Sequence, residues 1–322
     1  MYKNFLGIDI GKDKFDVALL HIDKPNKVKT KVFTNNANGF EKLLLWLKNK
    51  NIGLLHACME ATGSYGTDLA EYLFNQKFKV SVVNPARIKS FGKVELSRNK
   101  TDQADAALIA RFAHKIDPKG WKPAPAHVKE LQALVGRLED LYKIERQEKN
   151  RLLVTKDSSA VNSINVILEV TEEQIKEIKS KIKKLINNNP DFKNKTDLLN
   201  SIPGVAEAII MNILAYAGNI EDFDNAKQYA AFAGLNPKQH QSGNMRGRTV
   251  LSKTGNPTIR KVLYLPAITA KKWNPIVQKF SKNLENAGKS KMCVIGACMR
   301  KLLHIIFGVL KTQTKFIYQE CA

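Results

Sequence analysis

The sequence predicts an α/β domain at the N-terminus followed by a largely helical remainder. Three observations support this: short apolar runs within residues 4–83, helical periodicity within residues 127–187, and apolar helical segments within residues 196–316. Strands come first and then alternate with helices, which is typical of a mixed α/β domain. A chain of 322 residues is long enough for about two domains with buried cores.

The α/β domain is predicted to span residues 1–120. Residues 4–34 contain apolar and alternating runs that predict strands. Asn38 is placed to cap a helix that contains Phe40 and Leu43. The further elements expected are a strand at 54–59, a helix near 67–76, a strand at 79–83 and a helix from about 101 to 114. Residues 121–125, Trp-Lys-Pro-Ala-Pro, are typical of an exit linker.

Residues 121–195 are predicted to form a long helical hairpin or coiled coil. Leucines at a 3-4-3 spacing mark its first helix, and a second set of apolar residues repeats that spacing. The two sets are Leu131, Leu134, Leu138, Leu141 and Ile175, Ile178, Ile182, Leu185. A plain amphipathic helix pair packed on its own domain would show the same pattern, so both interpretations stay open.

The third predicted domain, residues 196–322, is mostly helical. The sequence Ser201-Ile-Pro-Gly-Val205 before an apolar helix at 206–217 resembles a helix-hairpin-helix, whose glycine turn lets backbone N–H groups approach a phosphate. An ordinary Pro-Gly turn explains the same residues. Residues 233–257 are predicted to be irregular, and helices resume through Phe316.

The net charge of +22 favours a polyanionic partner, because Lys and Arg that neutralise phosphates release counterions. Residues 201–322 hold 17 basic against six acidic residues, and no acid occurs between Asp224 and Glu285. A solvated lysine-rich surface is the alternative explanation. No run approaches the ~20 apolar residues of a membrane span. Cys293 and Cys298 are expected to be core thiols, and a reduced cytosolic setting is the default.

Four acidic residues suggest a metal site. Asp9 lies inside an apolar strand, where a carboxylate is costly unless it is paired or binds a cation, and Glu60 ends another apolar strand. Asp102 and Asp105 are three residues apart at a helix start and therefore share a face. A mixed sheet could bring all four to one edge. Oxygen ligands suit Mg²⁺ or Mn²⁺, and two such ions ~4 Å apart can support phosphodiester transfer.

Three segments resemble the Asp-Glu-Asp-Asp motifs of a known enzyme family. They are Gly7-Ile-Asp-Ile-Gly-Lys12, Met59-Glu-Ala-Thr-Gly63 and Arg98-Asn-Lys-Thr-Asp-Gln-Ala-Asp105. The resemblance resumes at Ile202-Pro-Gly-Val205, Phe232-Ala-Gly-Leu-Asn-Pro237, Gln241-Ser-Gly243 and Lys253-Thr-Gly-Asn256, so it covers nearly the whole chain. The chain is similar to the DEDD transposases of bacterial insertion sequences, which are guided by a bridge RNA.

The resemblance implies a RuvC-like N-terminal domain with the ribonuclease H topology. It implies that Asp9, Glu60, Asp102 and Asp105 bind Mg²⁺ or Mn²⁺, and that Ser242 is a nucleophile that becomes covalently joined to DNA. It further implies that a structured non-coding RNA pairs with donor and target DNA, and that protomers assemble as dimers or tetramers. The expected enzyme is a bacterial cytoplasmic recombinase that associates with the nucleoid when active and has no membrane partner.

The assignment of Ser242 depends on the resemblance alone. A bare hydroxyl needs activation, and no His-Asp pair stands near it in the sequence. Many relatives have a glycine pair after this serine, whereas here Gly243 is followed by Asn244. His240 could orient the serine, contact a phosphate or be a passive loop residue. The residues expected to contact nucleic acid are Arg98, Lys100, Lys238, His240, Arg246, Arg248, Lys253, Arg260 and Lys261.

Three other functions fit part of the sequence. A structure-selective nuclease of the same fold would use the acids and a metal-activated water without a serine. An actin-like or sugar-kinase ATPase also has an Asp-x-Gly loop after its first strand, as in Asp9-Ile-Gly11, but a second such motif is missing and the basic C-terminal half would be unexplained. A non-catalytic RNA-binding protein explains the charge but leaves the acids without a role.

Overall fold

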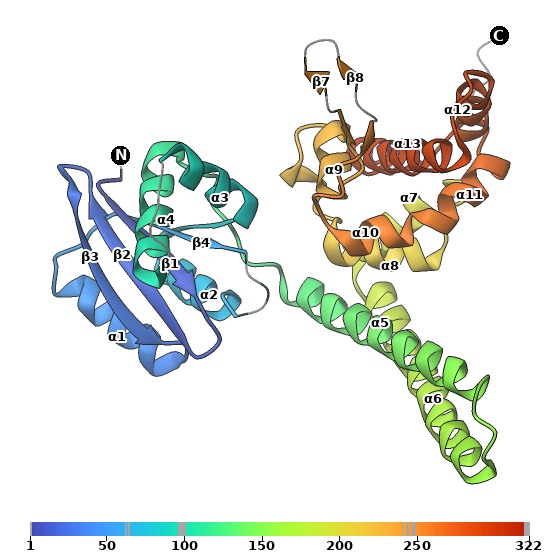
Figure 1. The fold of residues 1–322 in the computed structure, drawn as a ribbon, viewed down its shortest axis with the longest axis horizontal. Coiled ribbons are helices and arrows are strands. Elements are labelled where there is room, and N and C mark those ends of the chain that lie inside the picture. Colours follow the sequence, from blue (N-terminus) through green and yellow to red (C-terminus); the bar gives the residue numbers. More distant parts are fainter. Residues whose placement is uncertain are drawn as a thin grey trace. The chain divides into compact units, whose positions relative to one another are not determined.

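The computed structural model describes residues 2–61, 63, 65–95, 101–239, 241–242, 245–246 and 249–318. The chain forms two compact units, Met1–Ala124 and Pro125–Ala322 (Figure 1). Each unit has its own layers and is described by itself.

A mixed five-stranded sheet forms the centre of the first unit. Its strands are β1 (Asn4–Ile10), β2 (Lys14–His21), β3 (Lys24–Thr34), β4 (Leu55–Glu60) and β5 (Lys79–Val83). Their order in the sheet is β3-β2-β1-β4-β5; β2 runs antiparallel to β1 and β3, whereas β4 is parallel to β1 and β5. The mixed α/β class that the sequence predicted is therefore confirmed.

Helices cover both faces of this sheet (Figure 1). They are α1 (Ala37–Lys48), α2 (Thr67–Asn75), α3 (Pro85–Val94) and α4 (Asp102–Ile116). On one face Leu6 and Ile8 pack with apolar residues of α1 and α2, and on the other face Phe5 packs with α4. A Cβ atom on Gly7 would lie only 2.0 Å from the carbonyl oxygen of Ala106, so α4 lies directly against β1.

The start of α1 differs from the prediction. Asn36, not Asn38, is the capping residue, because its backbone is extended and its side chain accepts a hydrogen bond of 2.9 Å from the N–H of Gly39. The helix α3 was not predicted, because it has a single buried residue, Ile88, and therefore little apolar periodicity.

Two long helices open the second unit. They are α5 (Ala126–Leu152) and α6 (Ser158–Asn188), and they pack along each other as the repeated spacing predicted. Leu131, Leu138, Ile175 and Ile182 are buried in their seam. The seam continues into the core of the helical body, since α5 also contacts α8 (Glu207–Tyr216). The structure thus shows a helical hairpin whose seam is continuous with the core of its own unit.

The helical body contains seven α-helices and two short two-stranded sheets among the described residues. Besides α8 its helices are α7 (Pro190–Asn200), α9 (Ala226–Phe232), α10 (Pro257–Val262), α11 (Tyr264–Trp273), α12 (Pro275–Asn286) and α13 (Lys291–Thr312), with one 3₁₀ turn at Ile220–Asp222. The short strands are β6 (Pro237–Lys238), β7 (Gln241–Ser242), β8 (Met245–Arg246) and β9 (Val250–Leu251), and the two sheets are β6-β9 and β7-β8.

The helix α13 is the centre of this body. By length and composition it could cross a membrane, a feature that the sequence analysis missed, but more than half of its most apolar stretch is buried. It packs against α7, α9, α11 and α12, as the core helix of a folded domain does. Cys298 is buried on it, whereas Cys293 is exposed in its first turn, so the expectation of a core thiol is wrong for Cys293. The helix ends at Thr312, because Gln313 adopts a left-handed conformation.

Candidate functional site

Three carboxylates lie side by side across the central strands of the first unit. Asp9 on β1 is directly opposite Asp16 on the antiparallel strand β2. On the other side Ile8 pairs with Met59 of β4, so Glu60 comes next to Asp9 along the parallel pair. Because side chains alternate along a strand, Asp9 lies on the same face as Gly7, the face that α4 covers.

The first turn of α4 adds two more carboxylates to this face. Asp102 is the first helical residue and Asp105 follows one turn later, while the Thr101 side chain caps the helix by accepting a 3.2 Å hydrogen bond from the N–H of Ala104. The pKa of Asp9 is raised by burial and by the charges of Asp105, Asp102 and then Asp16. The pKa of Glu60 is raised by burial and by Asp9 and Asp105. The four predicted acids therefore share one electrostatic environment.

Asp16 was not among the predicted site residues, although the structure places it beside Asp9. Its residue surface is only 4% exposed, and its pKa is raised by burial against the opposing effect of Lys14. A signal was available, since Asp16 is a single acid inside an apolar strand, as Asp9 is. We call Asp9, Asp16, Glu60, Asp102 and Asp105 together the acidic face.

One lysine neutralises part of the acidic face. The Nζ atom of Lys14 lies 2.9 Å from Oδ2 of Asp102 and 3.7 Å from Oδ2 of Asp16. Within the described ranges, no three acidic, histidine or cysteine side chains are close enough together to hold a metal ion. The donors nevertheless fit Mg²⁺ or Mn²⁺ in kind, because they are all carboxylates and their mutual repulsion is what a divalent cation relieves.

A second polar cluster in this unit has the composition of a catalytic triad but not its exposure. His56 Nε2 lies 2.9 Å from Ser81 Oγ, and His56 Nδ1 lies 3.3 Å from Oδ1 of Asp117. Ser81 is fully buried and its hydroxyl is 3.0 Å from the carbonyl oxygen of Pro118. The cluster therefore fastens the chain after α4 to the sheet. Burial lowers the pKa of His56 to about 4, so this histidine is neutral at pH 7.

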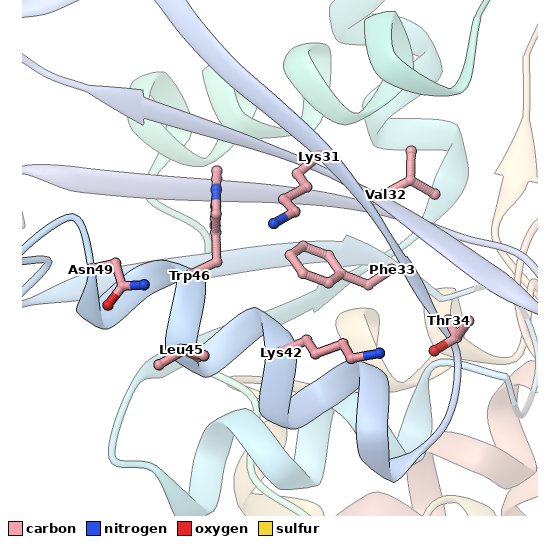
Figure 2. A pocket seen from close by; sticks show the side chains of 8 residues that line it. All are labelled: Lys31, Val32, Phe33, Thr34, Lys42, Leu45, Trp46 and Asn49. Atoms are coloured by element: carbon pink, nitrogen blue, oxygen red, sulfur yellow. The ribbon is translucent and has the colours of Figure 1, made fainter.

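A hollow of about 330 Å³ lies between the edge strand β3 and α1, which covers the sheet face opposite α4 (Figure 2). Lys31 and Lys42 line it together with the aromatic rings of Phe33 and Trp46. None of the residues that line it is acidic. Phe33 is buried, whereas Trp46 is partly exposed. Lysines can bind phosphates, and an accessible aromatic ring beside them can stack on an unpaired base.

Ser242 belongs to the second unit, at the end of β7, where it pairs with Met245 of β8. Its side chain, like that of Arg246, lies outside the described residues. The base of this loop is held by backbone hydrogen bonds: the N–H of Ser252 donates to Asn236 over 2.8 Å and that of Asn256 donates to Phe232 over 2.6 Å. The predicted nucleophile thus stands on a short hairpin beyond an anchored base.

The basic residues expected to bind nucleic acid have different surroundings. Lys238 and Lys253 are exposed at the base of the loop. Arg260 donates a 3.1 Å hydrogen bond to the carbonyl oxygen of Ala233, and Lys261 forms an ion pair with Glu139. Both of these therefore have partners inside the protein. The remaining predicted contacts, Arg98, Lys100, His240 and Arg248, lie outside the described residues.

The Pro-Gly turn before α8 is packed within the helical body. Gly204 has a φ of +93°, and a Cβ there would lie 2.8 Å from the Cα of Ala270 on α11. The carbonyl oxygen of Pro203 accepts a 3.3 Å hydrogen bond from Nδ2 of Asn274. Packing against α11 is sufficient to explain the glycine, and phosphate binding by this helix-hairpin-helix-like turn remains a prediction.

Two family models match the chain. A model of IS110-type DEDD proteins, described as a transposase, matches residues 6–158, and a model described as "Transposase IS116/IS110/IS902 family" matches residues 196–282. The first match includes all five residues of the acidic face, and the second includes Ser242.

Individual relatives cover almost the whole chain. The pilin gene-inverting protein of Moraxella bovis is 32% identical over 328 residues, which cover 98% of this chain and 98% of the relative. The pilin gene-inverting protein of Moraxella lacunata is equally similar. The transposase for insertion sequence element IS1111A of Coxiella burnetii is 24% identical over 352 residues, covering 97% of this chain and 90% of the relative.

Proposed function

The chain belongs to the IS110 family of transposases and is a DNA transposase or recombinase, and from this premise we propose a mechanism that uses both units. In it, Asp9, Glu60, Asp102 and Asp105 hold divalent metal ions, and Ser242 is the nucleophile. The observation that supports it best is the row of carboxylates across β2, β1 and β4. The strand order of this unit is consistent with a ribonuclease H-like, RuvC-like domain.

The acidic face would position the reacting phosphate. Bound Mg²⁺ or Mn²⁺ supplies Lewis-acid stabilisation of the oxygens that gain negative charge in phosphodiester transfer. Asp9 and Glu60 lie on paired strands, and Asp102 and Asp105 lie on a helix packed against them, so their backbones are held by the sheet. Such fixed supports favour a preorganised ligand set.

The serine step exchanges one ester bond for another. The Oγ atom of Ser242 attacks a DNA phosphorus and loses its proton, a new phosphoserine ester forms, and the 3′ oxygen of the cut strand leaves as a hydroxyl. Attack by the 3′ hydroxyl of a second strand then restores the phosphodiester and releases the serine. This assignment is supported by the family resemblance around Gln241-Ser-Gly243 and by the second family match.

We also propose that a structured RNA encoded beside the gene selects the DNA sites. The excess of basic residues and the hollow between β3 and α1 support an RNA contact, because the partly exposed ring of Trp46 lies next to Lys31 and Lys42 (Figure 2). Trp46→Ala is expected to weaken binding of that RNA about tenfold, within the range for one stacked base. Trp273→Ala, which removes an exposed tryptophan from the other unit, is the matched control.

Self-association is proposed through the hairpin of the second unit. Val166, Ile167 and Val170 of α6 are exposed apolar residues at helical spacing, with 60%, 42% and 56% of their surface accessible. Covering such a stripe with a second copy would remove apolar surface from water. Val170→Glu is expected to shift the molecular mass measured by light scattering toward the monomer, and an unchanged mass would exclude this surface.

The names of the relatives suggest two outcomes of one chemistry. One group is named for inverting a pilin gene and another for an insertion sequence. Both need DNA strands to be cut and rejoined to new partners. We propose that the chain performs this strand exchange in transposition, and that inversion is the outcome when two suitable sites lie on one DNA molecule.

Strand exchange in a purified system tests this proposal. The protein, the RNA transcribed from the flanks of its gene, and donor and target DNA are combined with Mg²⁺, and the joined product is quantified. Full activity of Asp102→Ala and Asp105→Ala would rule out the metal site, and undiminished exchange without RNA would rule out the guide. Metal-dependent cutting that persists in Ser242→Ala would instead favour a nuclease that uses water.

A further inference from the structure

Lys14 is placed among carboxylates by a tightly held turn. The N–H of Gly11 donates a 2.9 Å hydrogen bond to the carbonyl oxygen of Lys14 and closes the β1–β2 turn. The side chain of Asn35 donates to the carbonyl oxygen of Gly11 over 3.0 Å, and the N–H of Asn35 donates to Asp13 over 2.9 Å. The backbone that presents Lys14 is therefore fixed at the end of the acidic face.

The ammonium group of Lys14 contacts two carboxylates of different exposure. It hydrogen-bonds Asp102 at 2.9 Å in a pair where both side chains are more than half exposed. It also lies 3.7 Å from Asp16, a carboxylate that is almost fully buried. Asp16 faces Asp9 across the strand pair, so Lys14 stands at one end of the row of carboxylates. A buried carboxylate needs a cationic or hydrogen-bonding partner, and Lys14 is such a partner for Asp16.

We propose that Lys14 is a positioning residue that acts as the resident counter-ion of the acidic face. In the metal-free protein it holds Asp102 by an ion pair. The carboxylates close on a divalent cation only after this pair opens, and Asp16 then retains the ammonium group beside the site. This inference deepens the proposed function and depends on its metal site.

The ion pair of Lys14 competes with metal binding for one of the proposed ligands. Asp102 is the acid that pairs with Lys14, and it belongs to the proposed ligand set. An exposed ion pair is weak enough to open when a metal ion offers a stronger partner. Removing the lysine should therefore tighten metal binding by roughly two- to fivefold, the range that one exposed pair corresponds to.

Manganese titration of the full-length protein, followed by electron paramagnetic resonance, tests this role without using activity. Lys14→Met is expected to lower the dissociation constant of Mn²⁺ by roughly two- to fivefold, and Lys14→Arg to leave it near the wild-type value. The control is Lys12→Met, which removes the same charge from the same exposed turn. A variant that only damaged the fold would bind Mn²⁺ more weakly, so the sign of the change separates the two explanations.

The inference is overturned if Lys14→Met binds Mn²⁺ no more tightly than Lys12→Met does. Asp9→Asn in the same titration separates this failure from failure of the proposed function. If Asp9→Asn abolishes Mn²⁺ binding while Lys14→Met leaves it unchanged, the metal site stands and the role of Lys14 falls. If Asp9→Asn binds Mn²⁺ as the wild type does, the metal site falls and the role of Lys14 falls with it.

Discussion

The two units present their proposed catalytic groups on very different supports. In the first unit Asp9, Asp16 and Glu60 lie on adjacent paired strands, and a helix pressed against Gly7 supplies two more carboxylates. In the second unit Ser242 lies on a two-residue strand beyond the anchored base of a loop. Metal ligands need fixed mutual geometry, whereas a nucleophile must reach a substrate strand. In the proposed mechanism, the first unit would hold the metal ions on fixed supports and the second would deliver the attacking group.

The largest expected effect comes from removing one charge of the acidic face. Asp9→Asn keeps the shape of the side chain but removes a proposed metal ligand from the middle of the row. Strand exchange should fall by at least about a thousandfold, a typical loss for a central catalytic group. DNA affinity, measured by gel shift, should stay within about twofold, since it comes mainly from the Lys and Arg residues that neutralise phosphates, and Asp9→Asn leaves these in place. Substantial remaining exchange would show that the carboxylates of the first unit are not the metal site.

A second prediction concerns the framework behind the acidic face. The pKa of His56 is lowered by burial to about 4, below the usual 6.5. As the pH falls, the unfolded chain therefore takes up a proton at His56 before the folded chain does. The contribution of His56 to the free energy of unfolding is complete above pH 6.5 and is lost as the pH falls from 6.5 to about 4. The loss is roughly 3 kcal/mol at most. Urea unfolding between pH 7 and 4 should show this slope, and His56→Gln should flatten it.

If the free energy of unfolding depends on pH equally in His56→Gln and the wild type, other groups cause the acid sensitivity of this unit. The Ser81 hydroxyl that His56 contacts is also held by backbone carbonyls after α4, so the substitution is expected to leave the sheet folded at pH 7.

The loop of the second unit is expected to contribute through phosphate contacts that depend on salt. Lys238→Gln, at the exposed base of the loop, should reduce the slope of log affinity against log salt concentration by about 0.9 for duplex DNA. Lys181→Gln is the control, because Lys181 is exposed on α6 and pairs with Glu177. Equal slopes for both variants would show that the loop base does not contact the DNA backbone.

The smallest expected effect is a gain in stability. The pKa of Asp9 is raised in the folded protein, so the charged carboxylate is disfavoured by folding and its cost is present above the unfolded pKa. Asp9→Asn should therefore unfold at a higher temperature than the wild type at pH 7 without metal. The gain should shrink as the pH is lowered, because protonation of the wild-type carboxyl group removes the same cost. A lower unfolding temperature for Asp9→Asn than for the wild type would mean that the charge of Asp9 does not destabilise the folded protein.

The sequence predicted the elements whose periodicity is strong. Residues 79–83 form β5 as expected, and the repeated leucine and isoleucine spacing forms the seam of α5 and α6. Elements with little apolar periodicity were missed, such as α3 with its single buried Ile88. The cap of α1 was placed two residues late, because both Asn36 and Asn38 have the right side chain and only the backbone conformation distinguishes them.

The candidate site was predictable where a charged residue lay in an apolar stretch of sequence. Asp9 was recognisable as a charge inside an apolar strand, and Asp16 is a charge of the same kind in the next strand. Its place opposite Asp9 depends on strand register, which a sequence pattern does not specify by itself. Ser242 is an ordinary polar residue in a polar stretch of sequence, so only the family resemblance identified it. The role of Lys14 arises from tertiary contacts and has no sequence signal.

The most direct test of the account is a denaturing gel that detects protein covalently joined to DNA. Labelled donor DNA, the flanking RNA and Mg²⁺ are incubated with the wild type, Ser242→Ala and Asp9→Asn. The account predicts an adduct with the wild type only, whose peptide map places the label on residue 242, while both variants still bind the DNA. An adduct that forms at wild-type levels with Ser242→Ala would contradict it.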